Sequence, residues 1–325
     1  MRPDADIPAA TPWTPPPHPD RADGARRRVG VEIEFGGLTV KAATEAVRRH
    51  FGGEIRYDGA HRGFVEGARV GDFAVEIDLD LAHRTPKSQA GRSFRDAVVG
   101  LSAVVIPTEI VCPPIAWDEA HALDALVAEL RGLGAAGTWE SPFYAFGAQL
   151  NPEPPSLETR ELIRTLRAFI LLRDWLRAEI HVAVSRQIWF FESPFPDGYC
   201  ALVLDPGYAP DLSGFIDDYL EHNPTRDREL DLLPMLRFLD EDRVRRALPG
   251  EKINKRPTWH YRLPNSEVAR ADWSIGLEWD RWVRVERLAA HPRLLTQAAA
   301  EWLHNYDSLV TRDWTPRAER LAAAL

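Results

Sequence analysis

Short segments in which apolar and polar residues alternate occupy much of the first half of the chain. The clearest is Val29–Phe35, where Val31 and Ile33 fall on one face and Glu32 and Glu34 on the other. This pattern predicts strands at residues 29–35, 54–57, 63–70, 72–79, 109–112 and 144–150, and helical periodicity predicts helices at 40–51, 93–104 and 117–133. Because only turn residues separate several of these strands, we expect antiparallel pairing.

The second half of the chain has a mainly helical pattern. Helices are predicted at residues 156–179, 211–222, 234–238, 241–248, 281–290, 292–304 and 315–325, with one strand at 258–263. Strands first and helices later are typical of an α+β domain. Neither a P-loop nor a GxGxxG segment follows any predicted strand, so the pattern does not indicate a parallel nucleotide-binding fold.

The first 28 residues differ from the rest of the sequence. They contain repeated prolines and an Arg/Asp-rich stretch, and they lack apolar periodicity. This composition predicts a disordered or loosely docked extension that folding does not require, with a partner-binding arm as the alternative. Residues 29–325 are then expected to form a single domain.

Carboxylates gather on the polar faces of two predicted strands. Glu32 and Glu34 share one such face, and Glu76 and Asp78 share the polar face of residues 72–79. A solvated sheet face is one interpretation. Neighbouring carboxylates, however, destabilise one another unless a cation compensates their charge. A divalent cation that prefers oxygen ligands, such as Mg²⁺, is the other interpretation.

Two further strands add amide and basic groups. Gln149 and Asn151 lie on the polar face of one, and His260 and Arg262 share a face of the other. Arginine binds phosphate oxygens in a bidentate manner, so acids, amides and an arginine together suit a site for metal and triphosphate. Three basic residues just before the last strand would add charge for phosphate, although a solvated loop is equally open: Lys252, Lys255 and Arg256.

Composition excludes several classes of protein. A net charge of −9 disfavours a broad nucleic-acid surface. No apolar run reaches the roughly 18–20 residues that a membrane span needs. The two cysteines, Cys112 and Cys200, form no zinc-type cluster and suit a reducing compartment. We therefore expect a cytoplasmic protein that binds neither nucleic acid nor membrane.

Five segments, taken in order, resemble the amidoligase family, whose relatives include glutamate–cysteine ligases. They are GVEIEF at 30–35, EIVCPPI at 109–115, SPFYAFGAQLNPE at 141–153, IDDYLEHNPTRDRELDLLP at 216–234 and RPTWHYRLPN at 256–265. The resemblance runs from about residue 27 to 305. It implies a glutamine-synthetase-like α+β fold. In that fold an antiparallel sheet has helices packed on one face, a concave face carries the site, and the C-terminal half is helical.

The resemblance also implies roles for individual residues. The Glu-x-Glu of the family's first strand binds metal, and Arg on its late strand contacts phosphate, so Glu34 and Arg262 are expected to act in catalysis. The family often has His at the position of Gln149, and an amide oxygen is a weaker ligand than imidazole. The implied metal ligands are Glu32, Glu34, Glu76, Glu109 and Gln149, and the implied ATP contacts are Arg262, His260, Lys252, Lys255 and Arg256.

The implied reaction joins a small-molecule or peptide carboxylate to an amine, with ATP and Mg²⁺ (or Mn²⁺). Phosphoryl transfer from ATP makes the carboxylate an acyl phosphate, which the amine then attacks, while the metal neutralises phosphate charge. Two alternatives stay open. One is a catalytically weakened nucleotide- or metabolite-binding protein of the same fold, which Gln149 favours. The other is a metal-dependent phosphoesterase.

Overall fold

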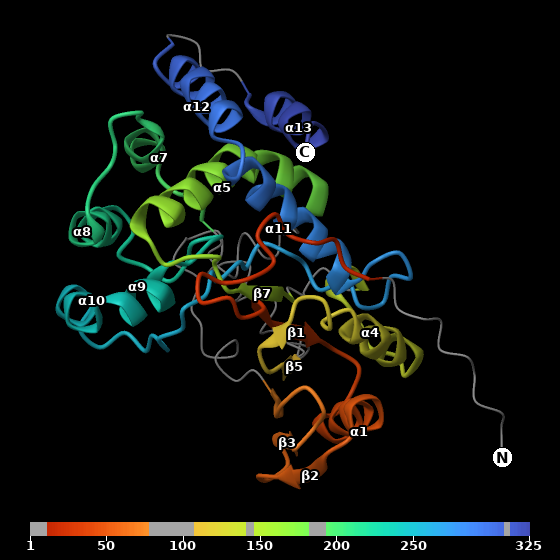
Figure 1. The fold of residues 1–325 in the computed structure, drawn as a ribbon. Coiled ribbons are helices and arrows are strands. Elements are labelled where there is room, and N and C mark those ends of the chain that lie inside the picture. Colours follow the sequence, from red (N-terminus) through yellow and green to blue (C-terminus); the bar gives the residue numbers. More distant parts are fainter. Residues whose placement is uncertain (1–11, 78–106, 141–145, 182–192, 309–312) are drawn as a thin grey trace, which may run out of the picture.

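The computed structural model describes residues 12–77, 107–140, 146–181, 193–308 and 313–325 (Figure 1). Its strands are β1 (Arg28–Phe35), β2 (Glu54–Tyr57), β3 (Arg62–Glu66), β4 (Phe73–Ile77), β5 (Thr108–Val111), β6 (Ile115–Ala116) and β7 (Ala148–Pro152). Its α-helices are α1 (Val40–Phe51), α4 (Ala122–Gly132), α5 (Thr159–Ile180), α7 (Asp197–Leu204), α8 (Leu212–His222), α9 (Leu233–Leu239), α10 (Glu241–Ala247), α11 (Ile275–Ala289), α12 (Pro292–Tyr306) and α13 (Thr315–Ala323). The predicted α+β class is confirmed.

The strands form one seven-stranded sheet in the order β2-β3-β4-β5-β1-β6, with β7 also paired to β1. Every pairing between these strands is antiparallel, as the short connections predicted. The turn between β2 and β3 contains Gly59 at φ +70°, a backbone conformation that glycine adopts without strain. The first strand therefore lies in the middle of the sheet, between β5 and β6 on one side and β7 on the other.

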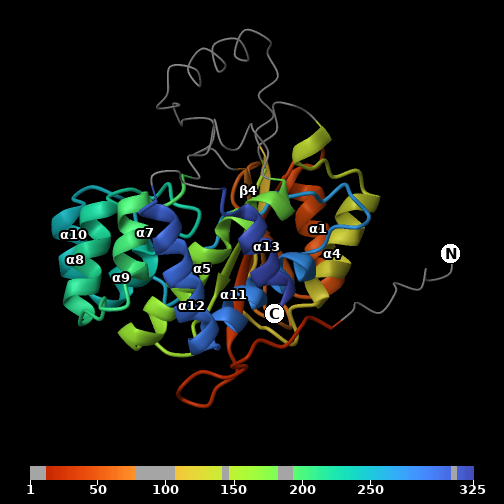
Figure 2. The same ribbon diagram turned by 90° about the horizontal axis from the view of Figure 1, so that it is seen from above.

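The apolar face of the sheet is covered by α1 and α4. Val31, Ile33 and Phe35 of β1 are completely buried on this side. Helix α1 contacts β3, β4 and α4. It lies so close to β3 that a Cβ atom at Gly63 would come within 2.4 Å of the Thr44 hydroxyl oxygen, so this position requires glycine. Figure 2 shows α1 and α4 on one side of the molecule and α8, α9 and α10 on the opposite side.

The long helix α5 organises the helical half of the chain, where it packs against α7, α11, α12 and α13. An aromatic cluster connects this half to residues 258–263, which lie beside β7. The ring centroids of Tyr261 and Trp282 are 5.3 Å apart, and those of Phe169 and Tyr261 are 6.1 Å apart. Among the described residues, no helix combines the length and apolar character that a membrane span needs.

The segment predicted as a strand at 258–263 alternates as expected, with Trp259, Tyr261 and Leu263 completely buried. It does not form a regular strand. Tyr261 instead makes isolated bridges to Leu150 of β7 and to Leu230. Prolines flank the segment at 257 and 264, and their missing N–H groups limit how far a ladder can extend.

Other predicted elements differ in their bounds. The helix predicted at 117–133 begins only at Ala122, because residues 115–116 pair with β1 as β6 and a turn follows. The helix predicted at 93–104 lies outside the described residues. Helix α7 was not predicted. Its apolar residues follow one another without helical spacing and are buried by contact with α5 and α12.

The N-terminal segment departs most clearly from the prediction. Residues 12–28 pack along the domain. The Trp13 ring is 4% exposed, stacks on Trp279 with ring centroids 5.6 Å apart, and donates to Asp124 at 2.8 Å. The expectation of a loosely docked extension is therefore corrected for these residues, and residues 1–11 lie outside the described part. Single anchoring side chains hold the segment, and such anchors leave no periodic pattern in the sequence.

Candidate active site on the polar face of the sheet

Strand register places the predicted acidic residues on one face. Glu34 of β1 lies directly opposite Glu109 of β5, which in turn lies opposite Glu76 of β4. One row along, Glu32 lies opposite Gln149 of β7. Residues directly opposite in antiparallel strands point to the same side. The structure therefore brings these five side chains to the polar face. The alternation predicted this for Glu32, Glu34, Glu76 and Gln149, the family resemblance implied it for Glu109, and their roles as metal ligands stay a prediction.

The described partners of these carboxylates are specific. Glu32 accepts hydrogen bonds from Arg256 at 2.7 Å and from the Asn151 amide at 3.2 Å. Glu34 is buried and accepts from the Gly147 N–H at 2.8 Å. Burial by itself would raise the pKa of Glu32. The positive charge of Arg256, the charge that His260 carries when it is protonated, and the two hydrogen bonds together outweigh burial and lower that pKa, so Glu32 is ionised at neutral pH.

Gln149 is held by His260. The His260 Nε2 atom lies 2.6 Å from the Gln149 Oε1 atom, and its Nδ1 atom lies 3.4 Å from buried Asp231. A neutral imidazole carries one proton, so it donates either to Gln149 or to Asp231, and the amide orientation of Gln149 follows that choice. Arg226 lies 3.5 Å from the same Asp231 oxygen. Gln149 thus belongs to a hydrogen-bonded group that the sequence did not predict.

We expect the free energy of unfolding to fall as the pH drops below about 6.5, the ordinary pKa of histidine. Burial lowers the pKa of His260. In this window the unfolded chain binds a proton that the folded chain takes up less readily, so acid favours unfolding. Denaturant titrations between about pH 5 and pH 8 measure the effect. His260→Gln should flatten the pH dependence, whereas His291→Gln, at an exposed histidine, should keep the wild-type slope. Equal slopes in all three proteins would contradict the assignment.

A cavity of about 340 Å³ opens on this face beside Glu32. Basic side chains from β1 and from the segment before Thr258 line it, together with Asn151: Arg28, Lys255 and Arg256. The Lys255 ammonium group donates to Glu241 of α10 at 2.9 Å, and this hydrogen bond fixes its position. Cys112 also lines the cavity, but burial raises the pKa of its thiol, which excludes a thiolate nucleophile at neutral pH. The cavity is therefore suited to an anion held near a carboxylate.

Three of the predicted ATP contacts do not line this cavity, and one of them is His260, which is bonded to Gln149 and Asp231. Arg262 is buried and donates to the Arg226 carbonyl oxygen at 2.5 Å, and it is not among the described residues that line the cavity. The Lys252 side chain is exposed, and its carbonyl oxygen accepts from Arg226 at 2.8 Å. Of the basic residues predicted to contact ATP, Lys255 and Arg256 line the cavity.

A family model described as "Putative amidoligase enzyme" matches residues 25–284. The chain belongs to this family. No curated protein matches the sequence. The match begins just before β1 and ends within α11, so it includes every residue of the candidate site. Trp13 and the helices α12 and α13 lie beyond it.

The geometry adds residues of this amidoligase that the sequence analysis had not assigned to the site. Arg28 precedes Glu32 by four positions on β1, so period-two alternation could have identified it. Asn151, which the alternation had already placed on the polar face, is 4% exposed, and its Oδ1 atom has no hydrogen-bond partner among the described residues. No sequence pattern could have identified Asp231 and Arg226, because their contacts with residues 260–262 span some thirty positions of sequence.

The donor set of the amidoligase fits a hard divalent cation by atom type and strand position. Glu34, Glu109 and Glu76 form one cross-strand row of carboxylates, and such oxygens are the ligands that Mg²⁺ prefers. As their side chains stand, no three acidic, histidine or cysteine groups among the described residues are gathered closely enough to hold an ion. Glu76 is paired with Arg62 at 2.8 Å and Glu32 with Arg256. Binding of a cation at these two carboxylates therefore requires the arginines to turn away.

Proposed function

We propose that this amidoligase uses ATP and Mg²⁺ (or Mn²⁺) to join a small-molecule or peptide carboxylate to an amine through an acyl phosphate. One observation carries the proposal: a row of three carboxylates lies on the same sheet face as a cavity lined by Arg28, Lys255 and Arg256. Clustered carboxylates suit the metal, and the basic group suits the phosphates. The two kinds of side chain that phosphoryl transfer needs thus share one face of the sheet, which supports the proposal.

The proposed steps use the chain's own side chains. The carboxylate oxygen of the substrate attacks the γ-phosphorus of ATP, and the bond to ADP breaks, with Arg256 and Lys255 stabilising the phosphate charge. The amine nitrogen then attacks the acyl carbon, and inorganic phosphate leaves. Glu32, ionised in the cavity, would accept hydrogen bonds from the substrate ammonium group and take up its proton. Glu34, Glu76 and Glu109 would hold Mg²⁺, which neutralises phosphate charge when it is bound.

The experiment that tests this function measures ADP and inorganic phosphate while purified protein is incubated with ATP, Mg²⁺ and a panel of amino acids and short peptides. We expect phosphate release that depends on a carboxylate–amine pair, with ADP formed in equal amount and a new amide detected by mass spectrometry. Phosphate released from phosphoesters without ADP would favour the phosphoesterase instead.

A second function, nucleotide binding without turnover, is favoured by one observation. Glu32 is engaged by Arg256, and Gln149 by His260, so neither side chain is turned toward a metal. ATP binding by calorimetry with no ADP formed for any substrate pair would identify this function.

Arg256→Ala is expected to weaken ATP binding roughly ten- to a hundredfold, because a hydrogen bond to a charged group contributes about 1.5–3 kcal/mol. Arg262→Ala is the matched control. It removes an arginine only six positions away whose described bond is to the Arg226 carbonyl oxygen, so it should cost stability more than ATP affinity. Isothermal titration calorimetry of both variants measures the difference. A larger loss of ATP affinity in Arg262→Ala would restore Arg262 as the phosphate contact.

A further inference from the structure

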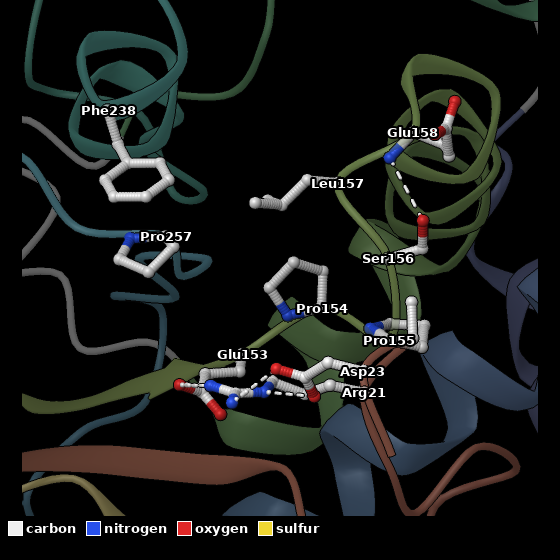
Figure 3. A pocket seen from close by; sticks show the side chains of 11 residues that line it. Arg21, Asp23, Glu153, Pro154, Pro155, Ser156, Leu157, Glu158, Phe238 and Pro257 are labelled. Atoms are coloured by element: carbon white, nitrogen blue, oxygen red, sulfur yellow. Dashed lines mark hydrogen bonds and ion pairs between the residues drawn. The ribbon is translucent and has the colours of Figure 1, made fainter. Parts of the chain in front are cut away.

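A second cavity, of about 460 Å³, adjoins the cavity on the polar face (Figure 3). Glu153 and Pro257 line both cavities, so the two are neighbours that meet at these residues. Glu153 is 4% exposed and accepts hydrogen bonds from the Arg28 N–H at 2.9 Å and from Arg21 at 3.2 Å. These bonds fix the N-terminal loop as part of the second cavity, so the packed segment 12–28 helps to build it.

Apolar rings form the walls of this second cavity. Figure 3 shows Phe238, from the last turn of α9, beside Pro257 on one wall, and Leu157 and Pro154 on the facing wall. The Phe238 side chain is 46% exposed although it is large and apolar. A large aromatic group left accessible in a concave wall is typical of a ligand site. The flat faces of a phenyl ring and a proline ring suit a planar ligand.

The two cavities differ in the balance of their charged side chains, although Glu153 lines both. In the second cavity the acidic residues Asp23, Glu153 and Glu158 outnumber the basic Arg21, which is bonded to Asp23 at 2.8 Å and to Glu153 at 3.2 Å. These acids repel an anion and offer acceptors to an amino group. The first cavity is basic at Arg256, the residue immediately before Pro257. One ligand with an anionic part and a neutral planar part matches the pair of cavities.

We propose that the second cavity binds the base of the nucleotide whose phosphates lie at Arg256 and Lys255, with the base stacked on Phe238. This inference rests on the proposed function, since it assigns the base of the ATP used there. The amino group of a purine would donate to the Asp23 carboxylate at the rim. Segment 255–257 would then contact both ends of the nucleotide, phosphates through its basic side chains and base through Pro257.

The test compares ATP with inorganic tripolyphosphate, which has the same phosphate chain without the base. Each ligand is titrated by calorimetry, in the presence of Mg²⁺, into the wild-type protein and into the variants Phe238→Ala and Phe238→Tyr. Tyr57→Ala serves as the control, because it removes a similarly exposed aromatic, 41% accessible, from the edge strand β2. Phe238→Ala should weaken ATP about tenfold, which corresponds to about 1.4 kcal/mol and lies within the range for base–aromatic stacking. Its affinity for tripolyphosphate should equal that of wild type, and Phe238→Tyr should bind ATP as wild type does.

The outcomes separate this inference from the function on which it rests. If wild type binds ATP and Phe238→Ala binds it equally well, the base lies elsewhere, while the proposed function stands. If ATP and tripolyphosphate weaken together in Phe238→Ala, or if the loss falls on the KM of the amine substrate instead, the base site is overturned and the second cavity belongs to another ligand. A wild type that binds neither ATP nor tripolyphosphate overturns the proposed function, and the base site with it.

Discussion

Replacing Arg27 with alanine is expected to lower the free energy of unfolding by about 3–5 kcal/mol, the usual loss when one partner of a buried ion pair is removed. Arg27 is 1% exposed and donates to both carboxylate oxygens of buried Glu286, at 2.8 and 2.5 Å. Its Nε atom also donates to the Glu153 carbonyl oxygen at 2.7 Å. The alanine variant would leave the Glu286 charge in the core with only the Trp282 N–H as a described partner.

The neighbouring residue provides the control. Arg26 makes ion pairs with Asp20 and Asp118, but its side chain is 45% exposed, so Arg26→Ala should cost less than about 1 kcal/mol. Urea denaturation followed by tryptophan fluorescence measures both variants. The double change Arg27→Met with Glu286→Leu should recover much of the loss, because it removes both charges together. Similar losses in the Arg26 and Arg27 variants would mean that residues 12–28 do not dock as described.

The second large effect is expected at Glu34. Glu34→Gln should reduce ATP-dependent turnover by at least about a hundredfold, since loss of metal charge stabilisation costs several kcal/mol of transition-state free energy. The amide oxygen of glutamine can still accept the Gly147 N–H that Glu34 now accepts, so folding should be preserved. The variant thus removes the charge while it keeps the hydrogen bond.

Glu66→Gln is the matched control for this change. Glu66 belongs to the same sheet, in β3, but its side chain is 47% exposed and paired with Arg56, away from the carboxylate row. Turnover should be unchanged in Glu66→Gln and reduced in Glu34→Gln. The same difference is expected for the affinity for Mn²⁺, which calorimetry measures without substrate. Unchanged Mn²⁺ affinity in a folded Glu34→Gln protein would exclude Glu34 as a ligand, whatever happens to activity.

Alternation along the chain determined which side chains share a face. In a strand the side-chain period is two, so Glu32 and Glu34 had to point away from Val31 and Ile33 wherever that strand paired. The same local rule gave the faces of Glu76 and Gln149, whereas Glu109 was added by the family resemblance. Short turns then predicted antiparallel neighbours. These features were predictable because each depends on residues close together in sequence, and the family resemblance extended them to a fold.

Tertiary structure alone decided which partners each side chain meets. Arg256 reaches Glu32 across 224 positions of sequence, and Gln149 meets His260 across 111. No periodicity encodes such pairs, because they depend on how β7 and the segment after α10 come to lie beside β1. For the same reason the sequence did not show that Trp13 and Arg27 anchor the N-terminal segment. Nor did it show that Phe238 and Pro257 face Pro154 and Leu157 across a second cavity. Each of these contacts depends on packing between elements that are remote in the chain.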